Sequence, residues 1–379
     1  MRDGMIIADA VIHGYNWTSA NYANPLAAEL AAGTVGAHQG IFSKPDESQL
    51  KEEEFINNWD SGLLEDTLIH ETEVDLVAYH GTPIWDYWKD GHSDYRKGLE
   101  LRDKYPGRVL IYGPLNPYHG QRALEEMKFL VEEVGVDGLK VFAASYHEGR
   151  TISQPLNDPK VAYPFIEQAI DLGVKVIATH KAIPLGPVRH ADYNVHDMDE
   201  PASRYPEVNF EIVHSGFAFL EETAMVVDRH PNVFANFEAT NSFAIKQQRR
   251  WADVLGTFLW YGGEDSIIFA SGCALVHPQP LIDALADFEM PADLVEGFGY
   301  KEFTPERKAK LLGQNYMRMH GIDPEDFKKR TANDAWAKAR GERSMEPVWS
   351  NARSREDFVR VERADLPGVQ VGPTVGVGG

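Results

Sequence analysis

Short apolar runs recur eight times along the chain, and most of the intervals between them hold a helical segment such as "GQRALEEMKFLVEEVG". The runs are dense in Val, Ile and Phe rather than strictly alternating, which is typical of strands buried on both faces of a parallel sheet. They cover residues 5–13, 74–80, 108–115, 136–145, 174–180, 208–214, 232–240 and 266–272.

Eight strand–helix units predict an α/β fold, most simply a (β/α)8 TIM barrel. A doubly wound open sheet is the structural alternative. It is disfavoured because no glycine-rich phosphate-binding turn follows the first run.

Two regions fall outside these units. Residues 15–60 form an insertion with the aromatic stretch "YNWTSANYANP" and the acidic stretch "KPDESQLKEEEF". Residues 323–379 contain one predicted helix, "DPEDFKKRTANDAWAKARG", and a tail ending in "PGVQVGPTVGVGG". We therefore predict a barrel over residues 1–322 with the insertion 15–60. We expect 323–379 to be a C-terminal helix and an extended arm at a subunit interface, with a loose terminus as the alternative.

Polar side chains close several of the predicted strands, at the barrel end where such enzymes carry their chemistry. Neutral imidazole is the commonest metal ligand, and a carboxylate beside it suits zinc, iron or manganese. We predict a divalent metal (Zn, Fe or Mn) held by some of these side chains, with catalytic roles for His214 and Glu238. The candidate metal ligands are His13, His80, His180, His214 and Glu238.

For each histidine the alternative is a strand cap that hydrogen-bonds a loop carbonyl. His180 and His214 stand out because they close neighbouring strands, whereas His80 precedes a Gly-Thr-Pro turn and also fits a structural role. Lys140, in the fourth run, could be a core lysine, a carboxylate clamp or a partner of Glu238 inside the barrel.

The long stretch "GPVRHADYNVHDMDEP" follows the fifth strand and is a candidate lid, because loops of this kind often close such sites. Its polar residues are either site groups or solvated loop residues. They include His190, Asp192, His196 and Asp197.

Composition narrows the classes of function. The formal net charge of −21 argues against nucleic-acid binding, because phosphate backbones repel an acidic chain. The apolar runs are too short to span a bilayer, and the N-terminus lacks the apolar stretch of a signal peptide. Cys273 is the only cysteine, which excludes an intrachain disulfide framework and a CxxC-type zinc site. We expect a cytoplasmic protein.

Several motifs together resemble the amidohydrolase-related metal-dependent hydrolases, the amidohydrolase 2 branch that includes aminocarboxymuconate semialdehyde decarboxylase and resorcylate decarboxylase. They are "AIDLGVKVIATH", "YPEVNFEIVHSG", "DSIIFASG" and "ERKAKLLGQNYMRMHGI", in that family's order over residues 5–322. The resemblance implies a distorted (β/α)8 barrel with a divalent metal at its mouth. It implies that His180 binds metal, and that His13 does so as the second member of a first-strand HxH motif. It implies that His214 binds either metal or substrate.

Two positions depart from that family's pattern. The first histidine of the HxH pair falls on Val11, and the eighth-strand aspartate falls on Gly272. In the family that aspartate binds metal and takes a proton from bound water, so ordinary hydrolysis is in doubt here. Cys273 beside it could be a ligand or a reactive thiol, but a packed neutral cysteine is favoured.

Three hypotheses follow. The first is a metalloenzyme with a rebuilt ligand set that acts on a small carboxylate or amino-acid-like substrate. Its reaction would be hydrolysis, decarboxylation or oxygenation. In the case of oxygenation, the chain would be a subunit of a non-haem iron or manganese monooxygenase. The second is a catalytically reduced subunit that stabilises an active paralogue in a homo- or hetero-oligomer. The third, a metal-free binding protein, is least favoured because His13, His180 and His214 would need separate explanations.

Overall fold

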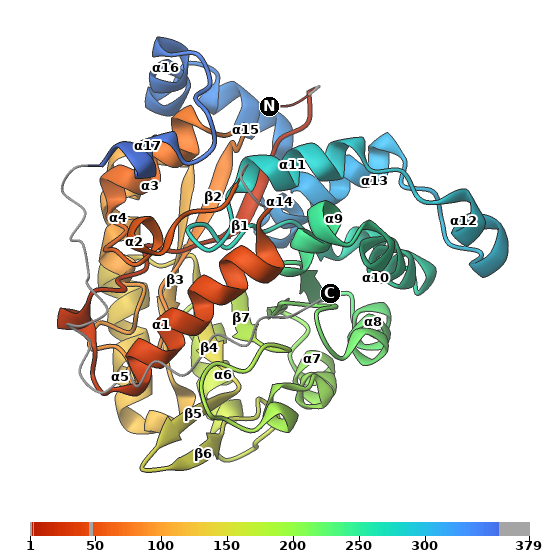
Figure 1. The fold of residues 1–379 in the computed structure, drawn as a ribbon. Helices are drawn as coiled ribbons and strands as arrows, with labels where there is room; N and C mark the ends of the chain where they lie inside the picture. Colours follow the sequence, from red (N-terminus) through yellow and green to blue (C-terminus); the bar gives the residue numbers. More distant parts are fainter. Residues whose placement is uncertain (1, 3, 45–47, 356–379) are drawn as a thin grey trace, which may run out of the picture.

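Eight parallel strands run around a nearly closed barrel in the computed structural model, which describes residues 2, 4–44 and 48–355 (Figure 1). Their spatial order follows the chain, β1-β2-β3-β4-β7-β8-β9-β10. The strands are β1 Ala8–Ile12, β2 Leu76–His80, β3 Val109–Pro114, β4 Gly138–Phe142, β7 Val176–His180, β8 Asn209–Val213, β9 Val233–Asn236 and β10 Ile267–Ile268.

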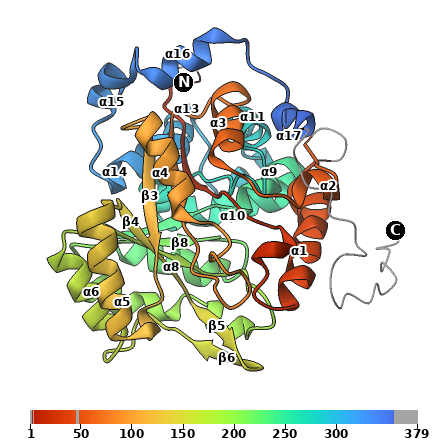
Figure 2. The same ribbon diagram turned by 90° about the vertical axis from the view of Figure 1, so that its left-hand side faces the viewer.

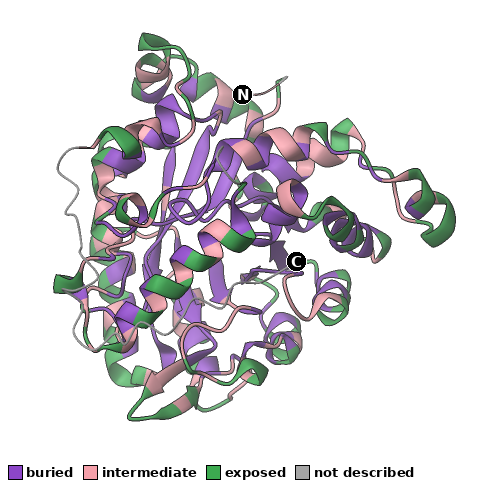
Figure 3. Cartoon of the chain, viewed as in Figure 1, coloured by how far each residue is buried: buried purple, intermediate pink, exposed green. Residues whose placement is uncertain are grey.

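Each of the eight predicted runs contains one of these strands, and the (β/α)8 barrel is confirmed. Nearly every strand residue is buried, as expected for strands with helices outside and packed side chains inside (Figure 3). The ring closes irregularly because β10 has only two residues. Beyond it, Ala10 N donates to Phe269 O at 3.0 Å and Gly272 N donates to Val11 O at 3.0 Å. This contact between the first and last strands excludes the doubly wound open sheet.

Helices surround the strands and also extend beyond the barrel at the C-terminal end of the described chain (Figures 1 and 2). Those of the first half are α1 Leu26–Ala37, α2 Glu52–Phe55, α3 Ser61–His70, α4 Tyr95–Lys104, α5 Gln121–Phe129, α6 Ala162–Asp171 and α7 Asp199–Arg204. Those of the second half are α8 Leu220–Arg229, α9 Phe243–Lys246, α10 Gln248–Trp260, α11 Pro278–Asp287, α12 Ala292–Phe298, α13 Pro305–Ala309, α14 Asn315–Met319, α15 Pro324–Thr331, α16 Ala335–Glu342 and α17 Ser350–Ser354.

The outer helices form where apolar residues recur at helical spacing, and some of them begin at a side chain that caps the first turn. In α6, Phe165, Ile166 and Ala169 are buried on one face. The carboxylate of Asp60 accepts from Leu63 N at 2.8 Å at the start of α3, which satisfies one of the free N–H groups there. Among the described residues, no helix has both the length and the apolar character that crossing a bilayer requires.

The insertion at 15–60 places α1 across the mouth of the barrel, where it crosses the front of the molecule in Figure 1 and lies at its right-hand edge in Figure 2. A π-helical turn, His38–Phe42, continues α1. Side chains of both segments line the pocket described below.

A two-stranded hairpin after β4 is absent from the sequence prediction, which ran the fourth strand on to residue 145. The hairpin pairs β5 Ala144–His147 with β6 Arg150–Ser153. Its turn residues Glu148 and Gly149 both have positive φ, +47° and +79°, as the tight turns that match strand twist require. Gly149, at the second position of the turn, was the feature of the sequence that could have predicted this hairpin.

The C-terminal segment differs from the single helix expected over 323–341. It forms two helices, α15 and α16, because Asp334 between them caps the second by accepting from Ala337 N at 2.8 Å. Trp336 and Trp349 are buried in this chain's own core, at 1% and 0% exposure. The tail predicted to extend as an arm lies outside the described residues from 356 onward.

Candidate active site

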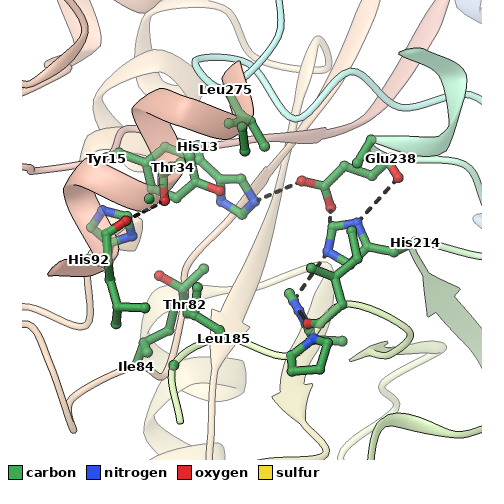
Figure 4. Close-up of a pocket in the computed structure, with 18 of the residues that line it drawn as sticks. His13, Tyr15, Thr34, Thr82, Ile84, His92, Leu185, His214, Glu238 and Leu275 are labelled. Carbon is green, nitrogen blue, oxygen red and sulfur yellow. Dashed lines mark hydrogen bonds and ion pairs between the residues drawn. The ribbon is translucent and has the colours of Figure 1, made fainter. Parts of the chain in front are cut away.

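A cavity of about 340 Å³ opens at the carboxyl ends of the strands, beneath α1. Its walls are mainly apolar and include Trp17, Phe142 and Phe217. Its polar end, called here the floor, consists of His13, Lys140, His180, His214 and Glu238. Figure 4 shows His13, His214 and Glu238 converging there. Four of the five predicted metal ligands thus meet in one place.

His13 follows β1 directly and points one ring nitrogen at the cavity. Its Nδ1 lies 2.9 Å from the backbone oxygen of His80, which can only accept a hydrogen bond. The ring proton therefore sits on Nδ1 in the neutral form. The unprotonated Nε2 lies 3.7 Å from Glu238 Oε1.

His180 and His214 are held in the same way at the ends of β7 and β8. His180 Nε2 donates to Ile183 O at 2.7 Å, and His214 Nδ1 donates to Glu238 O at 3.2 Å. The remaining nitrogens, His180 Nδ1 and His214 Nε2, face each other at 3.3 Å. His214 adopts φ +66°, a conformation that is uncommon outside glycine and concentrates at functional sites.

Because each ring's other nitrogen donates to the backbone, the nitrogens that face each other, His180 Nδ1 and His214 Nε2, both carry a lone pair. When His180 and His214 are neutral, the two nitrogens 3.3 Å apart both present lone pairs, which repel unless a cation or proton lies between them. Two ligands of one ion at about 2.1 Å stand about 3.0–3.5 Å apart, so the observed spacing matches a shared cation.

Glu238, just beyond β9, supplies the carboxylate of the floor. Its oxygens lie 3.7 Å from His13 Nε2 and 3.7 Å from His214 Nε2. Gly272, the position that the family resemblance assigns to an aspartate, lies against it. A Cβ added to Gly272 would stand 2.6 Å from Glu238 Oε1. The carboxylate of Glu238 thus occupies the space into which a side chain at residue 272 would project.

Electrostatics at the floor favour neutral rings at His180 and His214 beside the ionised carboxylate of Glu238. Burial lowers the pKa of His180 and of His214, although Glu238 opposes the shift in both. Burial would raise the pKa of Glu238, but His214, His13 and Lys140 around it outweigh burial and hold that pKa well below its usual range. A carboxylate of this kind is a ligand or counter-ion and a weak proton acceptor.

Lys140, on β4, lines the cavity with only 1% of its surface exposed. Burial lowers its pKa, while Glu238 and Glu211 oppose the shift. Among the described residues its Nζ has no hydrogen-bond partner. It is therefore a buried lysine inside the barrel that lines the cavity, not a lysine that reaches the surface.

The structure does not bring His80 into the cavity. It is fully buried and its ring stacks on Tyr112 at 4.0 Å. The backbone oxygen of His80 instead accepts from His13 Nδ1 and so orients that ring. Val11, which stands where the family pattern has a histidine, packs among the apolar residues of the barrel interior. The prediction of His80 as a ligand is therefore not supported by its position.

The first residues of the loop that follows β7 line the cavity, whereas the charged residues further along it do not. Ile183, Pro184, Leu185 and Gly186 line the cavity. Asp197 instead pairs with buried Lys181 at 2.6 Å. The other charged members of the predicted lid also lie outside the cavity lining, namely His190, Asp192 and His196.

Cys273 is buried, and burial raises its thiol pKa well above the ordinary value. It does not line the cavity, so it is a packed neutral thiol. The neighbouring Ser271 holds the closing strands together, because Asp9 accepts from Ser271 N at 2.8 Å. Burial raises the pKa of Asp9 to about 7 although Ser271 opposes the shift.

Sequence reasoning missed the aromatic side of the pocket. Tyr15 stacks on His13 at 4.6 Å and on His92 at 4.4 Å, and Trp17 meets His92 at 4.0 Å. The signal was the aromatic stretch directly after His13, since residues that follow a barrel strand border its mouth. His92 had no such signal because it comes from a loop after β2.

In the part of the chain that the structure describes, no three His, Cys, Asp or Glu side chains already stand close enough to cage a metal ion. The floor side chains still form a chain of short gaps, from His13 to Glu238, to His214, to His180. His and carboxylate donors in this combination suit zinc, iron or manganese.

Comparison with known proteins gives a family and a set of structures of the same fold. A model of the family described as amidohydrolase matches residues 88–322. No curated protein matches the sequence.

Solved structures are similar at low sequence identity. An uncharacterized TIM-barrel protein from Bordetella bronchiseptica is 14% identical, covering 84% of this chain and 100% of its own, with a TM-score of 0.56. A 2,6-dihydroxybenzoate decarboxylase complexed with 2,6-dihydroxybenzoate is 15% identical, covering 84% and 98%, with a TM-score of 0.51. The manganese-bound 5-carboxyvanillate decarboxylase from Novosphingobium aromaticivorans is 12% identical, covering 85% and 98%, with a TM-score of 0.50. At these identities the likeness establishes the fold.

Proposed function

Because the chain belongs to the amidohydrolase family, we propose that it is a divalent-metal enzyme that acts on a small carboxylate. The proposed ligands are the side chains of the floor other than lysine, namely His13, His180, His214 and Glu238. Zinc, iron and manganese all suit this donor set, and manganese is bound in the similar 5-carboxyvanillate decarboxylase structure.

One observation carries the proposal. His180 Nδ1 and His214 Nε2 face each other at 3.3 Å while each ring's other nitrogen is committed to a backbone oxygen. Two separate strand caps would have no reason to turn their lone pairs toward each other. A shared cation would explain both orientations at once.

When bound, the metal would supply a Lewis acid beside the substrate carboxylate. The protein residues would orient that carboxylate and exclude water. The apolar walls limit the number of water molecules in the cavity, and Phe142 and Phe217 present only carbon to a bound ligand. Tyr15 and His92 form an aromatic side against which a planar ligand could pack.

Decarboxylation fits the floor better than hydrolysis does. Hydrolysis needs a group that accepts a proton from water, and Glu238, the only carboxylate of the floor, is here a proposed metal ligand rather than a free base. Decarboxylation breaks the bond between the carboxylate carbon and the rest of the substrate, releases CO₂ and adds one proton, drawn from solvent, to the carbon left behind. It needs no carboxylate base on the protein. The similar dihydroxybenzoate and carboxyvanillate decarboxylase structures agree with this reaction class.

The test is turnover of the purified, metal-loaded chain on a panel of small aromatic and aliphatic carboxylates, with CO₂ and ester or amide hydrolysis measured in parallel. The proposal expects CO₂ release and little hydrolysis. Hydrolysis without CO₂ would contradict it. The oxygenase hypothesis stays a prediction and expects iron in the chain with O₂ consumption. The reduced-subunit hypothesis also stays a prediction and expects no turnover until a co-purified paralogue is added.

A further inference from the structure

Lys140 poses a problem that the proposed metal does not solve. Its ammonium group is 1% exposed, lines the cavity and makes no hydrogen bond among the described residues. A buried ammonium group without hydrogen bonds is costly, and proteins usually satisfy it. The nearby carboxylates Glu238 and Glu211 attract it without bonding to it.

A second buried lysine in the same fold shows the usual solution. Lys181 is also 1% exposed, and its Nζ lies 2.6 Å from Asp197 Oδ1. The fold thus gives a buried ammonium a direct partner where the role is structural. Lys140 lacks such a partner and faces the cavity, so its partner is expected to come from a ligand.

The charges of the floor point to the sign of that ligand. A bound divalent cation would add two positive charges where the floor supplies one carboxylate, Glu238, so the occupied floor would attract an anion. Buried charge of one sign needs a counter-charge, so an anion should enter with the metal. The only other charged side chain that lines the cavity among the described residues, Glu29, is exposed at the rim and negative. A second carboxylate at the outer end would be repelled.

Helix α1 limits the other end of the cavity. Leu30, Gly33, Thr34 and Ala37 line it from one face of that helix and are called here the roof. A Cβ added to Gly33 would meet no atom within 4 Å, so this part of the roof borders open space.

We propose that Lys140 anchors the carboxylate of a monoanionic substrate with an apolar body, and that the roof of α1 sets the size of the body that fits. This inference rests on the proposed metal-dependent function, because the positive charge of the floor includes the metal. It makes Lys140 a substrate-binding residue and Gly33 a specificity-determining position.

Titration calorimetry on the metal-loaded chain tests the anchor with benzoate, its neutral analogue benzamide and the dianion isophthalate. The wild-type chain should bind benzoate about tenfold or more tightly than benzamide, because a hydrogen bond to a charged group is worth that much. It should bind isophthalate more weakly than benzoate. Equal binding of benzoate and benzamide would overturn the proposal, and this comparison needs no variant to fold.

Lys140→Met should reduce the preference for benzoate by about tenfold, to the part that the metal alone provides, while leaving benzamide binding within about twofold, and Lys140→Arg should retain the full preference. A purely structural lysine predicts a different result, an equal loss for both ligands. Circular dichroism checks the fold of each variant. An equal loss in a folded Lys140→Met variant would contradict the anchor.

The roof is tested by a matched pair of glycines on α1. Gly33 lines the cavity and Gly36 does not, yet both are exposed and a Cβ at either meets no atom within 4 Å. Gly33→Leu should weaken 2-naphthoate binding more than benzoate binding, and Gly36→Leu should change neither. The same effect from both variants would contradict the role of the roof.

Metal content, measured on the same samples, separates this inference from the proposed function. Wild-type protein that binds no metal would contradict the proposed function itself. Protein that binds metal, and binds benzoate independently of Lys140, would contradict only the anchor.

Discussion

At the scale of single residues, the main finding is that a carboxylate is present at the floor although the expected strand does not supply it. Gly272 leaves a space, and Glu238 from the neighbouring strand fills it. If the proposed function holds, Gly272 and Glu238 together form a rebuilt ligand set. Sequence alone could not show this, because the reach of a side chain from one strand into the space of the next depends on the barrel's register.

Whether a carboxylate at residue 238 and one at residue 272 can serve the same role can be tested by moving the carboxylate from 238 to 272. Glu238→Ala should weaken metal binding by about tenfold or more, and Gly272→Asp in that background should restore part of it. Asp tolerates the positive φ of +71° at residue 272 better than most residues do. The metal affinity of each variant is measured by competition with a chelator.

Gly272→Asp alone should disturb the floor, because even its Cβ would meet Glu238. Gly272→Ala is the matched control, since it adds the same Cβ without a second carboxylate. If Gly272→Asp binds metal as the unaltered chain does, the side chain at 272 does not face the site.

His13, His180 and His214 were predictable because each closes a strand, and the carboxyl ends of barrel strands must converge. His80 closes a strand too, but its ring turns toward Tyr112 in the barrel interior. His80 and His180 are each the last residue of their strand, yet only His180 lines the cavity, so a place at a strand end does not by itself decide which way a ring turns.

At the scale of elements, the C-terminal helix α17 is held to the barrel by one buried carboxylate. Glu71 accepts from Trp349 N at 2.9 Å, from Asn351 N at 2.8 Å and from His277 Nε2 at 2.8 Å. His277 Nδ1 meanwhile accepts from Gln279 N at 3.1 Å and so caps α11, which requires the neutral ring. One pair of residues therefore fixes two helices.

This arrangement predicts that acid loosens the C-terminal segment. Burial lowers the pKa of His277 although Glu71 opposes the shift, so the unfolded chain takes up a proton first and stability falls as pH drops below about 6.5. Burial opposes ionisation of Glu71, but His277 and Asn351 outweigh it and lower its pKa, so a further loss follows below about 4.5. Each group contributes at most about 1.4 kcal/mol per pH unit.

Hydrogen exchange of residues 345–354 between pH 7.5 and 4.5 measures this release. The amides of Trp349 and Asn351 should lose protection before those of the barrel strands. Glu71→Gln, which keeps the shape and removes the charge, should shift the release to higher pH. Protection that stays uniform down to pH 4.5 would contradict this account.

The elements themselves were largely predictable, since each of the eight strands lies within an apolar run. The break between α15 and α16 was missed, although Thr331, Asn333 and Asp334 are weak helix formers and Asp is a preferred N-cap residue. Tertiary contacts add to this local signal. Arg108 Nε binds Asp334 Oδ2 at 2.6 Å and so stabilises the cap that starts α16. Contacts of this range have no signal in local pattern.

At the scale of the whole molecule, the proposed ligands come from strands far apart in the sequence, so a bound metal would stabilise the fold. His13 lies at the end of β1 and Glu238 just beyond β9, and the two strands flank the irregular closure of the barrel through β10. A metal bound between them links elements that the short β10 joins with few backbone hydrogen bonds.

The melting temperature should therefore depend on metal. A ligand that binds only the folded state stabilises it by about 2.7 kcal/mol at a concentration 100 times its Kd. Calorimetry of metal-free protein, before and after one equivalent of manganese or zinc, should show a rise of several degrees, and magnesium, which prefers oxygen ligands, should give less. An unchanged melting temperature with all three ions would contradict the coupling.

The central claim is that the floor holds one divalent metal, and elemental analysis of protein purified without added metal tests it most directly. Three proteins are compared: the unaltered chain, His180→Ala, and His190→Ala as a control on an exposed histidine outside the cavity. The account predicts about one zinc, iron or manganese per chain in the unaltered protein and in His190→Ala, and loss of that metal in His180→Ala. Metal that survives in His180→Ala, or is absent from the unaltered protein after reconstitution, would contradict it.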